Sequence, residues 1–204
     1  MKKKALIFDL DNTIYAVSSI AGRLFAPLFQ LLEESGESGD HLNAVKQDLM
    51  RKPFQWIAEK YGFSQSLTAK GIHLLQNLTY DGPIEPFPDY EEIKKLPQKK
   101  FLVTSGFQKL QQSKIEKLQL EQDLEEIVIV DVEATTKKAV FAGLLLRYNL
   151  APSEVLAIGD DPDSELKAAR ELGIDAVLYN HHHEQPGQPA YPVIFNYREL
   201  PVFL

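Results

Sequence analysis

The chain has 204 residues, of which 44% are hydrophobic and 10% aromatic, enough for one full core with room for a small second one. Its net charge of −7 argues against a nucleic-acid polymer as partner, because a phosphate backbone is bound by a basic face. Cysteine is absent, which excludes a disulfide framework, a thiolate metal site and a thiol nucleophile. No apolar stretch approaches the roughly 20 residues that cross a bilayer, so we expect a cytoplasmic protein with no membrane partner.

Five short apolar runs predict the strands of a core. In chain order they cover residues 5–8, 101–103, 127–130, 155–158 and 176–179. Each run is nearly continuous rather than alternating, which is typical of a parallel sheet covered by helices on both faces. The segments between the later runs have helical periodicity, with Gly173 as a helix stop. This order predicts an α/β fold with a doubly wound parallel sheet.

The connection after the first run is much longer than a crossover helix needs. Its apolar positions repeat with helical spacing in three segments, near residues 20–31, 54–61 and 67–78. Breaks at residues 35–39, at Gly62 and at residues 81–88 separate or close these segments. We therefore expect a small all-helical domain at residues 16–83, inserted into a core made of residues 1–15 and 84–204.

Several aromatic side chains of this insert could line a pocket, namely Phe25, Phe29, Phe54 and Trp56. Their helical spacing favours positions in the helical core instead. Tyr15 is the better pocket candidate, because it lies just past a polar cluster where the chain should leave the core.

Polar clusters follow four of the five runs, beginning at Asp9, Thr104, Asp131 and Gly159. Ligands of open α/β sheets bind beyond the carboxyl ends of the strands, so these clusters should converge. Asp9, Asp11 and Asp160 would then bring three carboxylates together, and these would repel one another unless a cation lay among them. Oxygen ligands suit Mg²⁺, which binds few carboxylates and often a substrate phosphate. We therefore expect Mg²⁺ as cofactor and an anionic ligand that carries a phosphate beside it.

The other polar residues suit a phosphate group. Thr104 offers a hydroxyl donor, and the backbone amides near Ser105 and Gly106 open a helix, whose N-terminus favours anions. Lys137 or Lys138, both at the start of a later helix, would complete the phosphate-binding groups.

Four motifs in this order resemble those of the haloacid dehalogenase (HAD) superfamily of phosphatases. They are Asp9-Leu10-Asp11-Asn12-Thr13 after a strand, the apolar run into Thr104, a lysine before a helix, and Gly159-Asp160-Asp161. The resemblance spans the whole chain apart from the details of the insert. It implies a Rossmann-like core in which the insert is a helical cap.

The same resemblance implies the chemistry of the first motif. Asp9 would attack phosphorus to form an aspartyl-phosphate, and Asp11 would be the general acid and then the general base. Mg²⁺ would be held by the Asp9 carboxylate, the Asp11 backbone carbonyl and Asp160. Glu165 stands where the family usually has a second metal-binding aspartate, so either Glu165 or Asp161 would support the metal.

Phosphate binding would fall to Thr104, Ser105 and Lys137. Lys137 is preferred to Lys138 because the family's lysine often lies four residues before a buried apolar residue, here Phe141.

The stretch from Asp9 to Tyr15 and the position of the insert resemble the pyrimidine 5'-nucleotidase-like branch of the superfamily. The resemblance therefore implies a small phosphorylated metabolite as substrate, with a nucleoside 5'-monophosphate as the first candidate. The alternatives are a phosphosugar mutase resembling β-phosphoglucomutase, a 2-haloacid dehalogenase, and a non-enzymatic binding protein that retains the fold. Asp11 counts against the dehalogenase, because those relatives generally lack an aspartate at that position.

Overall fold

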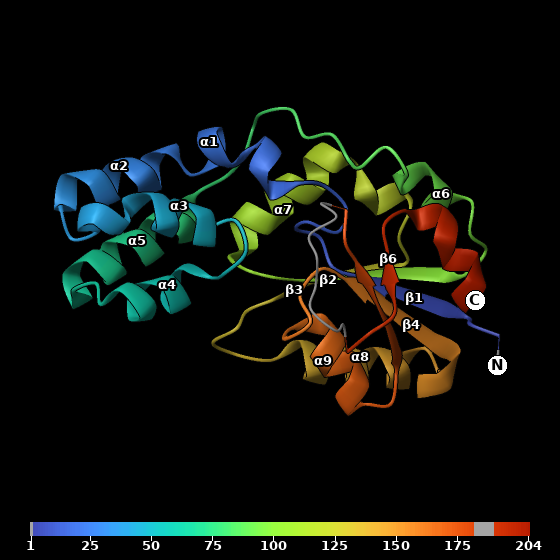
Figure 1. Cartoon of the computed structure of the whole chain (residues 1–204). Coiled ribbons are helices and arrows are strands. Elements are labelled where there is room, and N and C mark those ends of the chain that lie inside the picture. Colours follow the sequence, from blue (N-terminus) through green and yellow to red (C-terminus); the bar gives the residue numbers. More distant parts are fainter. Residues whose placement is uncertain (1, 182–189) are drawn as a thin grey trace.

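The computed structural model describes residues 2–181 and 190–204 (Figure 1). Within these ranges six parallel strands form one sheet in the order β3-β2-β1-β4-β5-β6. The strands are β1 (Ala5–Phe8), β2 (Lys99–Ser105), β3 (Glu126–Val130), β4 (Val155–Gly159), β5 (Asp175–Tyr179) and β6 (Val193–Ile194). The chain moves from β1 outward to β3, then returns to β4 on the other side of β1. The predicted α/β class with a doubly wound parallel sheet is confirmed.

Helices cover both faces of the sheet. Helices α8 (Lys137–Arg147) and α9 (Glu165–Glu171) pack on one face, against Ile7, Phe101 and Ala157. Helices α6 (Tyr90–Lys94) and α7 (Gln108–Leu118) and the 3₁₀ helix Tyr197–Phe203 pack on the other, against residues such as Phe8 and Leu102. Successive strand residues point to opposite faces, so burial of both faces requires the continuous apolar runs of the sequence.

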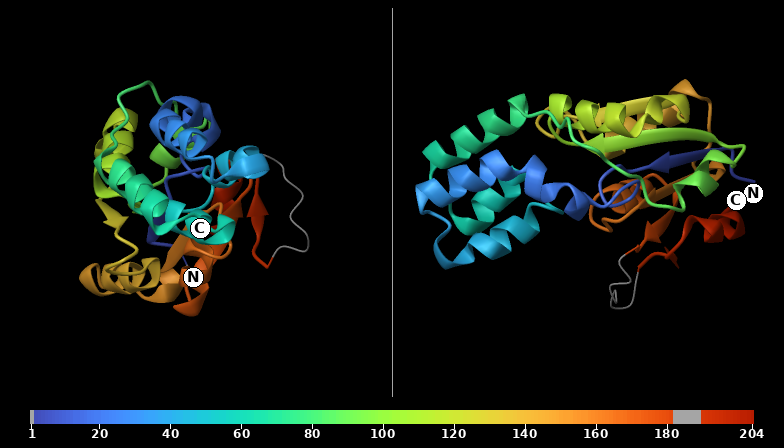
Figure 2. Two further views of the ribbon diagram at one scale, coloured as in Figure 1. Left: turned by 90° about the vertical axis from the view of Figure 1, so that its left-hand side faces the viewer. Right: turned by 90° about the horizontal axis from the view of Figure 1, so that it is seen from above.

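Five α-helices between β1 and α6 form a bundle beyond the carboxyl ends of the strands (Figures 1 and 2). They are α1 (Ala21–Leu24), α2 (Ala26–Ser35), α3 (Leu42–Asp48), α4 (Phe54–Tyr61) and α5 (Gln65–Asn77). Their buried side chains, including Leu28, Ile57 and Leu75, belong to the same hydrophobic cluster as the α7 side of the sheet. The bundle is therefore packed against the core and not tethered loosely to it.

Local sequence explains several helix boundaries. Ser64 and Thr136 cap α5 and α8, each accepting a hydrogen bond from a backbone N–H three residues on, at 3.1 and 3.2 Å. Helices α2 and α4 end at Gly36 and Gly62, both with a left-handed φ of 68° that glycine adopts without steric cost.

Three features of the bundle differ from the prediction. Segment 20–31 is two helices, because Pro27 lies in the first turn of α2, where a proline starts a helix rather than continuing one. Helix α3 is not among the predicted segments. Val45 is its one buried residue, so its sequence has no repeat of apolar positions that would predict a helix. Trp56, expected in the helical core, is 43% exposed, with the Lys60 ammonium 5.0 Å from its ring centroid.

The C-terminal tail returns to the loop after β1. The Tyr197 hydroxyl donates to the Thr13 carbonyl at 2.5 Å, and the Tyr197 backbone N–H donates to the buried carboxylate of Asp89 at 2.8 Å. The tail therefore supports the loop that carries Asp9 and Asp11. Among the residues that the structure describes, no helix has both the length and the apolar character needed to span a bilayer.

Gly71 in α5 leaves room for the ring of Phe54, since a β-carbon on Gly71 would lie 2.3 Å from that ring. We expect Gly71→Ala to lower the free energy of unfolding by about 1–3 kcal/mol, because overpacking outweighs the gain in helix propensity. Gly22→Ala in α1 is the matched control, since its β-carbon would meet nothing within 4 Å. The control should raise stability by about 0.4–1 kcal/mol. Urea unfolding measures both, and equal gains in the two variants would contradict the packing of Phe54 on Gly71.

Candidate active site

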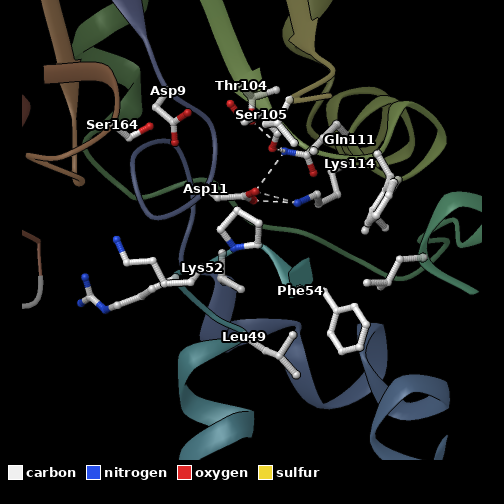
Figure 3. A pocket seen from close by; sticks show the side chains of 18 of the residues that line it. Asp9, Asp11, Leu49, Lys52, Phe54, Thr104, Ser105, Gln111, Lys114 and Ser164 are labelled. Atoms are coloured by element: carbon white, nitrogen blue, oxygen red, sulfur yellow. Dashed lines mark hydrogen bonds and ion pairs between the residues drawn. The ribbon is translucent and has the colours of Figure 1, made fainter. Parts of the chain in front are cut away.

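The polar residues that follow the strands converge where the strand order reverses (Figure 3). Asp9 follows β1, Thr104 lies in β2, Asp160 follows β4 and Lys137 begins α8, and all four line one cavity of about 600 Å³. This is the crevice beyond the carboxyl ends of the strands in which α/β sheets bind ligands. Much of the opposite wall comes from the loop after β1 and the helical bundle, through Val17, Phe25, Leu49, Met50, Phe54 and Leu75.

Three carboxylates of this cavity, from Asp9, Asp160 and Glu165, offer oxygens that lie within 4.8 Å of one another. We call them the acidic cluster. Lys137 Nζ donates to Asp9 at 2.7 Å and to Glu165 at 2.8 Å, whereas Lys138 has a side chain that is 48% exposed. Burial raises the pKa of Asp9 to about 7, although Lys137 opposes the rise. Burial, with Glu165 and Asp9 as neighbours, raises the pKa of Asp160 well above its usual value. Negative charge therefore exceeds positive charge here, as in cation sites.

Glu165, rather than Asp161, joins the acidic cluster. Its side chain is 2% exposed, and one of its oxygens accepts from the backbone N–H of Asp161 at 2.8 Å. Gly159 provides the space, because a β-carbon there would lie 2.1 Å from the Glu165 carboxylate. The Asp161 carboxylate instead accepts from Lys52 at 2.8 Å. Of the two alternatives that the sequence leaves open, only Glu165 lies within reach of Asp9 and Asp160.

Asp11 lies in a different electrostatic environment. Lys114 Nζ donates to its two oxygens at 2.7 and 2.9 Å, Gln111 donates at 3.0 Å, and the Tyr15 hydroxyl donates at 2.5 Å. Burial alone would raise the pKa of Asp11, but these donors, with Lys114 foremost, lower it below its usual value. Tyr15 is completely buried, so it supports this carboxylate and is not the pocket residue that the sequence suggests.

Thr104 and Ser105 line the cavity at the end of β2. Thr104 Oγ1 accepts from the Gln111 amide at 2.7 Å, so the hydroxyl keeps its own proton to donate to a ligand. Ser105 lines the cavity, and its carbonyl accepts from the same amide at 3.2 Å. Phe107 and Gln108, which lead into α7, also line the cavity, so the N-terminus of that helix borders it.

Gln111 and Lys114 are site residues that the sequence motifs do not reveal. They lie three residues apart on α7 and therefore share one face of the helix. Their exposure of 2% and 3% is unusual for such polar side chains. The sequence offers one signal for them, which is two polar residues spaced three apart in the helix that follows the Thr104 strand. The same spacing is common on helix faces that are exposed to solvent.

The segment between α3 and α4 reaches the acidic cluster. Arg51 Nη1 lies 3.6 Å from an Asp160 oxygen, and both Arg51 and Lys52 line the cavity. The carbonyl of Met50 accepts from Asn12 Nδ2 at 3.1 Å. This part of the bundle therefore contacts both the loop after β1 and the loop after β4.

Fold, motif order and site geometry agree with one known family. The sequence profile described as haloacid dehalogenase-like hydrolase matches residues 3–173. The chain belongs to this family. The predicted membership and the predicted enzyme class, a hydrolase of the HAD type, are confirmed.

Individual relatives of this HAD hydrolase are distant. A glyceraldehyde 3-phosphate phosphatase from Methanopyrus kandleri is 22% identical over 210 residues, which cover 91% of this chain and 88% of that protein. A haloacid dehalogenase-like family protein from Streptococcus pneumoniae has a TM-score of 0.74 at 17% identity, over 99% of each chain. A HAD phosphatase from Thermococcus onnurineus has a TM-score of 0.69 at 20% identity, over 100% of this chain and 97% of the other. These two structures support the fold, and the first relative supports the phosphatase type.

Replacing Lys114 would remove the principal positive charge beside Asp11. Because the pKa of Asp11 is lowered from 3.8 in the folded state, this contact stabilises the protein above about pH 4, and its contribution is lost as the pH falls through the lowered pKa. We therefore expect Lys114→Met to lower the free energy of unfolding by about 1–3 kcal/mol at pH 7, and by less as the pH approaches 3. Urea unfolding at both pH values measures the difference.

The matched control is Lys109→Met. Lys109 lies on the same helix, is exposed, and donates to Asn77 at 3.0 Å. It should change stability by no more than about 0.5 kcal/mol at either pH. An equal loss in Lys114→Met at both pH values would contradict a charge contact with Asp11.

Proposed function

We propose that this hydrolase is a magnesium-dependent phosphatase that cleaves small phosphate monoesters through an aspartyl-phosphate on Asp9. The acidic cluster is the observation that carries the proposal. Its donors are carboxylate oxygens, which fit a hard divalent cation such as Mg²⁺. The carboxylates of Asp9 and Asp160 and the backbone carbonyl of Asp11 would hold the ion. When bound, Mg²⁺ neutralises charge on the transferring phosphoryl group and orients it.

In the first step a carboxylate oxygen of Asp9 would attack phosphorus, and the bond from phosphorus to the leaving oxygen would break. Thr104, Ser105 and Lys137 would donate hydrogen bonds to the phosphoryl oxygens. The hydroxyl proton of Thr104 suits this role because its oxygen already accepts from Gln111. These donors would stabilise charge on the phosphoryl group as the bond order changes.

Asp11 would transfer the protons of both steps. It would give a proton to the leaving oxygen, and later take one from the water that attacks phosphorus and breaks the bond to Asp9. The lowered pKa keeps Asp11 ionised in the free protein, as the base of the second step requires. A phosphate dianion entering the cavity adds negative charge nearby, which favours the protonated acid needed in the first step.

We assign residues 16–83 as a cap over this site, with residues 1–15 and 84–204 as the core. The contacts of Met50, Arg51 and Lys52 with the loops after β1 and β4 support the assignment. So does the cavity, which both parts line. Such a cap would exclude bulk water while the phosphoryl group is transferred.

The proposed substrate is a small phosphorylated metabolite. A nucleoside 5'-monophosphate is one candidate, from the resemblance of the first motif to the pyrimidine 5'-nucleotidase-like branch. Glyceraldehyde 3-phosphate is another, from the name of the Methanopyrus kandleri relative.

Phosphate release from acetyl phosphate, sugar phosphates and nucleotides, with Mg²⁺ or with a chelator, tests the proposal. We expect release that the chelator abolishes, and a fall in kcat by a factor on the order of 10⁴ or more in Asp9→Asn, which loses the nucleophile. Asp161→Asn is the matched control and should remain active, because Asp161 pairs with Lys52 outside the acidic cluster. Full activity of Asp9→Asn would contradict the covalent step. Chloride release from 2-chloropropionate without any phosphate release would indicate a dehalogenase instead.

A further inference from the structure

The cavity has two chemically different ends (Figure 3). The acidic cluster, Asp11 and Thr104 form the catalytic end. In Figure 3, Leu49 and Phe54 lie on the side opposite Asp9 and Thr104. The side chains that form this apolar end are Val17, Phe25, Leu49, Phe54, Leu75 and Leu110. A group attached to a phosphate at the catalytic end would therefore extend toward an apolar wall.

The apolar end is preformed. The side chains of Phe25, Leu49, Phe54 and Leu75 are each at most 8% exposed. The ring of Phe54 is fixed between Gly71, which leaves space for it, and Phe63, whose ring centroid is 6.3 Å away. An apolar ligand could thus be bound without rearrangement of this wall, as in most small-molecule sites.

Each cation that lines the cavity already has a polar partner. Arg51, Lys114 and Lys137 form ion pairs with carboxylates of the catalytic end, and Lys52 pairs with Asp161. Lys109 also lines the cavity and donates to the Asn77 amide. Two exposed carboxylates, from Asp131 and Glu133, border the same cavity. A second anionic group on the substrate would meet these carboxylates, so the electrostatics favour an uncharged leaving group.

We propose that the apolar end is a leaving-group subsite that takes an uncharged aromatic group carried on the phosphate ester. The inference rests on the proposed phosphatase function and names its substrate class. A cavity of about 600 Å³ has room for a phosphate and a ring system, and Phe25 and Phe54 offer aromatic partners for that ring. Apolar side chains cannot replace the hydrogen bonds that a leaving group rich in hydroxyls makes with water, so such a group would depend on Gln55 and Gln76, which also line the cavity.

Two esters of aliphatic alcohols test the subsite without a large difference in leaving-group chemistry. We expect the wild-type kcat/KM for benzyl phosphate to exceed that for glycerol 3-phosphate by at least about 10-fold. Leu49→Asn and the conservative Phe54→Leu should each lower this ratio at least about 3-fold, provided that thermal unfolding shows a folded protein. Phe54→Leu keeps a large apolar side chain, so it tests the wall even if Leu49→Asn does not fold.

Trp56→Ala is the matched control, because Trp56 lies on the same helix as Phe54 but is exposed and is not part of the cavity wall. It should leave the ratio unchanged. Acetyl phosphate separates two kinds of failure. If the wild type does not hydrolyse acetyl phosphate, the proposed phosphatase function fails. If it does so but prefers glycerol 3-phosphate, or if Phe54→Leu keeps the full preference for benzyl phosphate, only the aromatic subsite is overturned.

Discussion

The close packing of three carboxylates, two of them paired with one buried ammonium group, is the constraint on which the rest of the site depends. Asp9, Asp160 and Glu165 offer oxygens within 4.8 Å of one another, and Lys137 donates to two of them, Asp9 and Glu165. Burying such a cluster costs free energy unless further positive charge joins it. The doubly wound sheet makes the cluster possible, because β1 and β4 are neighbours whose ends deliver Asp9 and Asp160 to one point. Helices α8 and α9 begin at Lys137 and Glu165, which lets two more elements contribute their first residues.

The two aspartates of the first motif lie two residues apart, yet their surroundings shift their pKa values in opposite directions. Burial raises the pKa of Asp9, whereas Lys114 dominates the donors that lower the pKa of Asp11. Pairs of acids whose environments separate their pKa values are typical of sites in which one acid is a nucleophile and the other transfers protons. Helix α7 therefore matters as much as the strands, because Gln111 connects Asp11 with Thr104 and Lys114 neutralises Asp11.

The sequence predicts what depends on burial and chain order. The strands are buried on both faces and so appear as apolar runs, and Asp9, Thr104 and Asp160 are found because each lies at or just past the end of a run. It does not predict what depends on the rotation of a helix or on local space. The burial of Gln111 and Lys114 can be predicted only if one knows which face of α7 turns toward the core. The exposure of Trp56 likewise depends on which face of α4 turns toward solvent. The choice of Glu165 over Asp161 depends on the space beside Gly159, which emerges only from packing.

Whether Mg²⁺ completes the acidic cluster is tested most directly by thermal unfolding at about pH 8, with Mg²⁺ or with a chelator. Because burial raises the pKa of Asp9 from 3.8 to about 7 in the folded state, its contribution to stability without metal falls as the pH rises through that range, and the raised pKa of Asp160 acts in the same direction. We expect Mg²⁺ to raise the Tm of the wild type by about 5–10 °C. Asp160→Asn should be more stable than the wild type without metal and respond little to Mg²⁺, whereas Asp161→Asn should respond as the wild type does. No shift in the wild type, or an equal shift in Asp160→Asn, would contradict a magnesium site at this cluster.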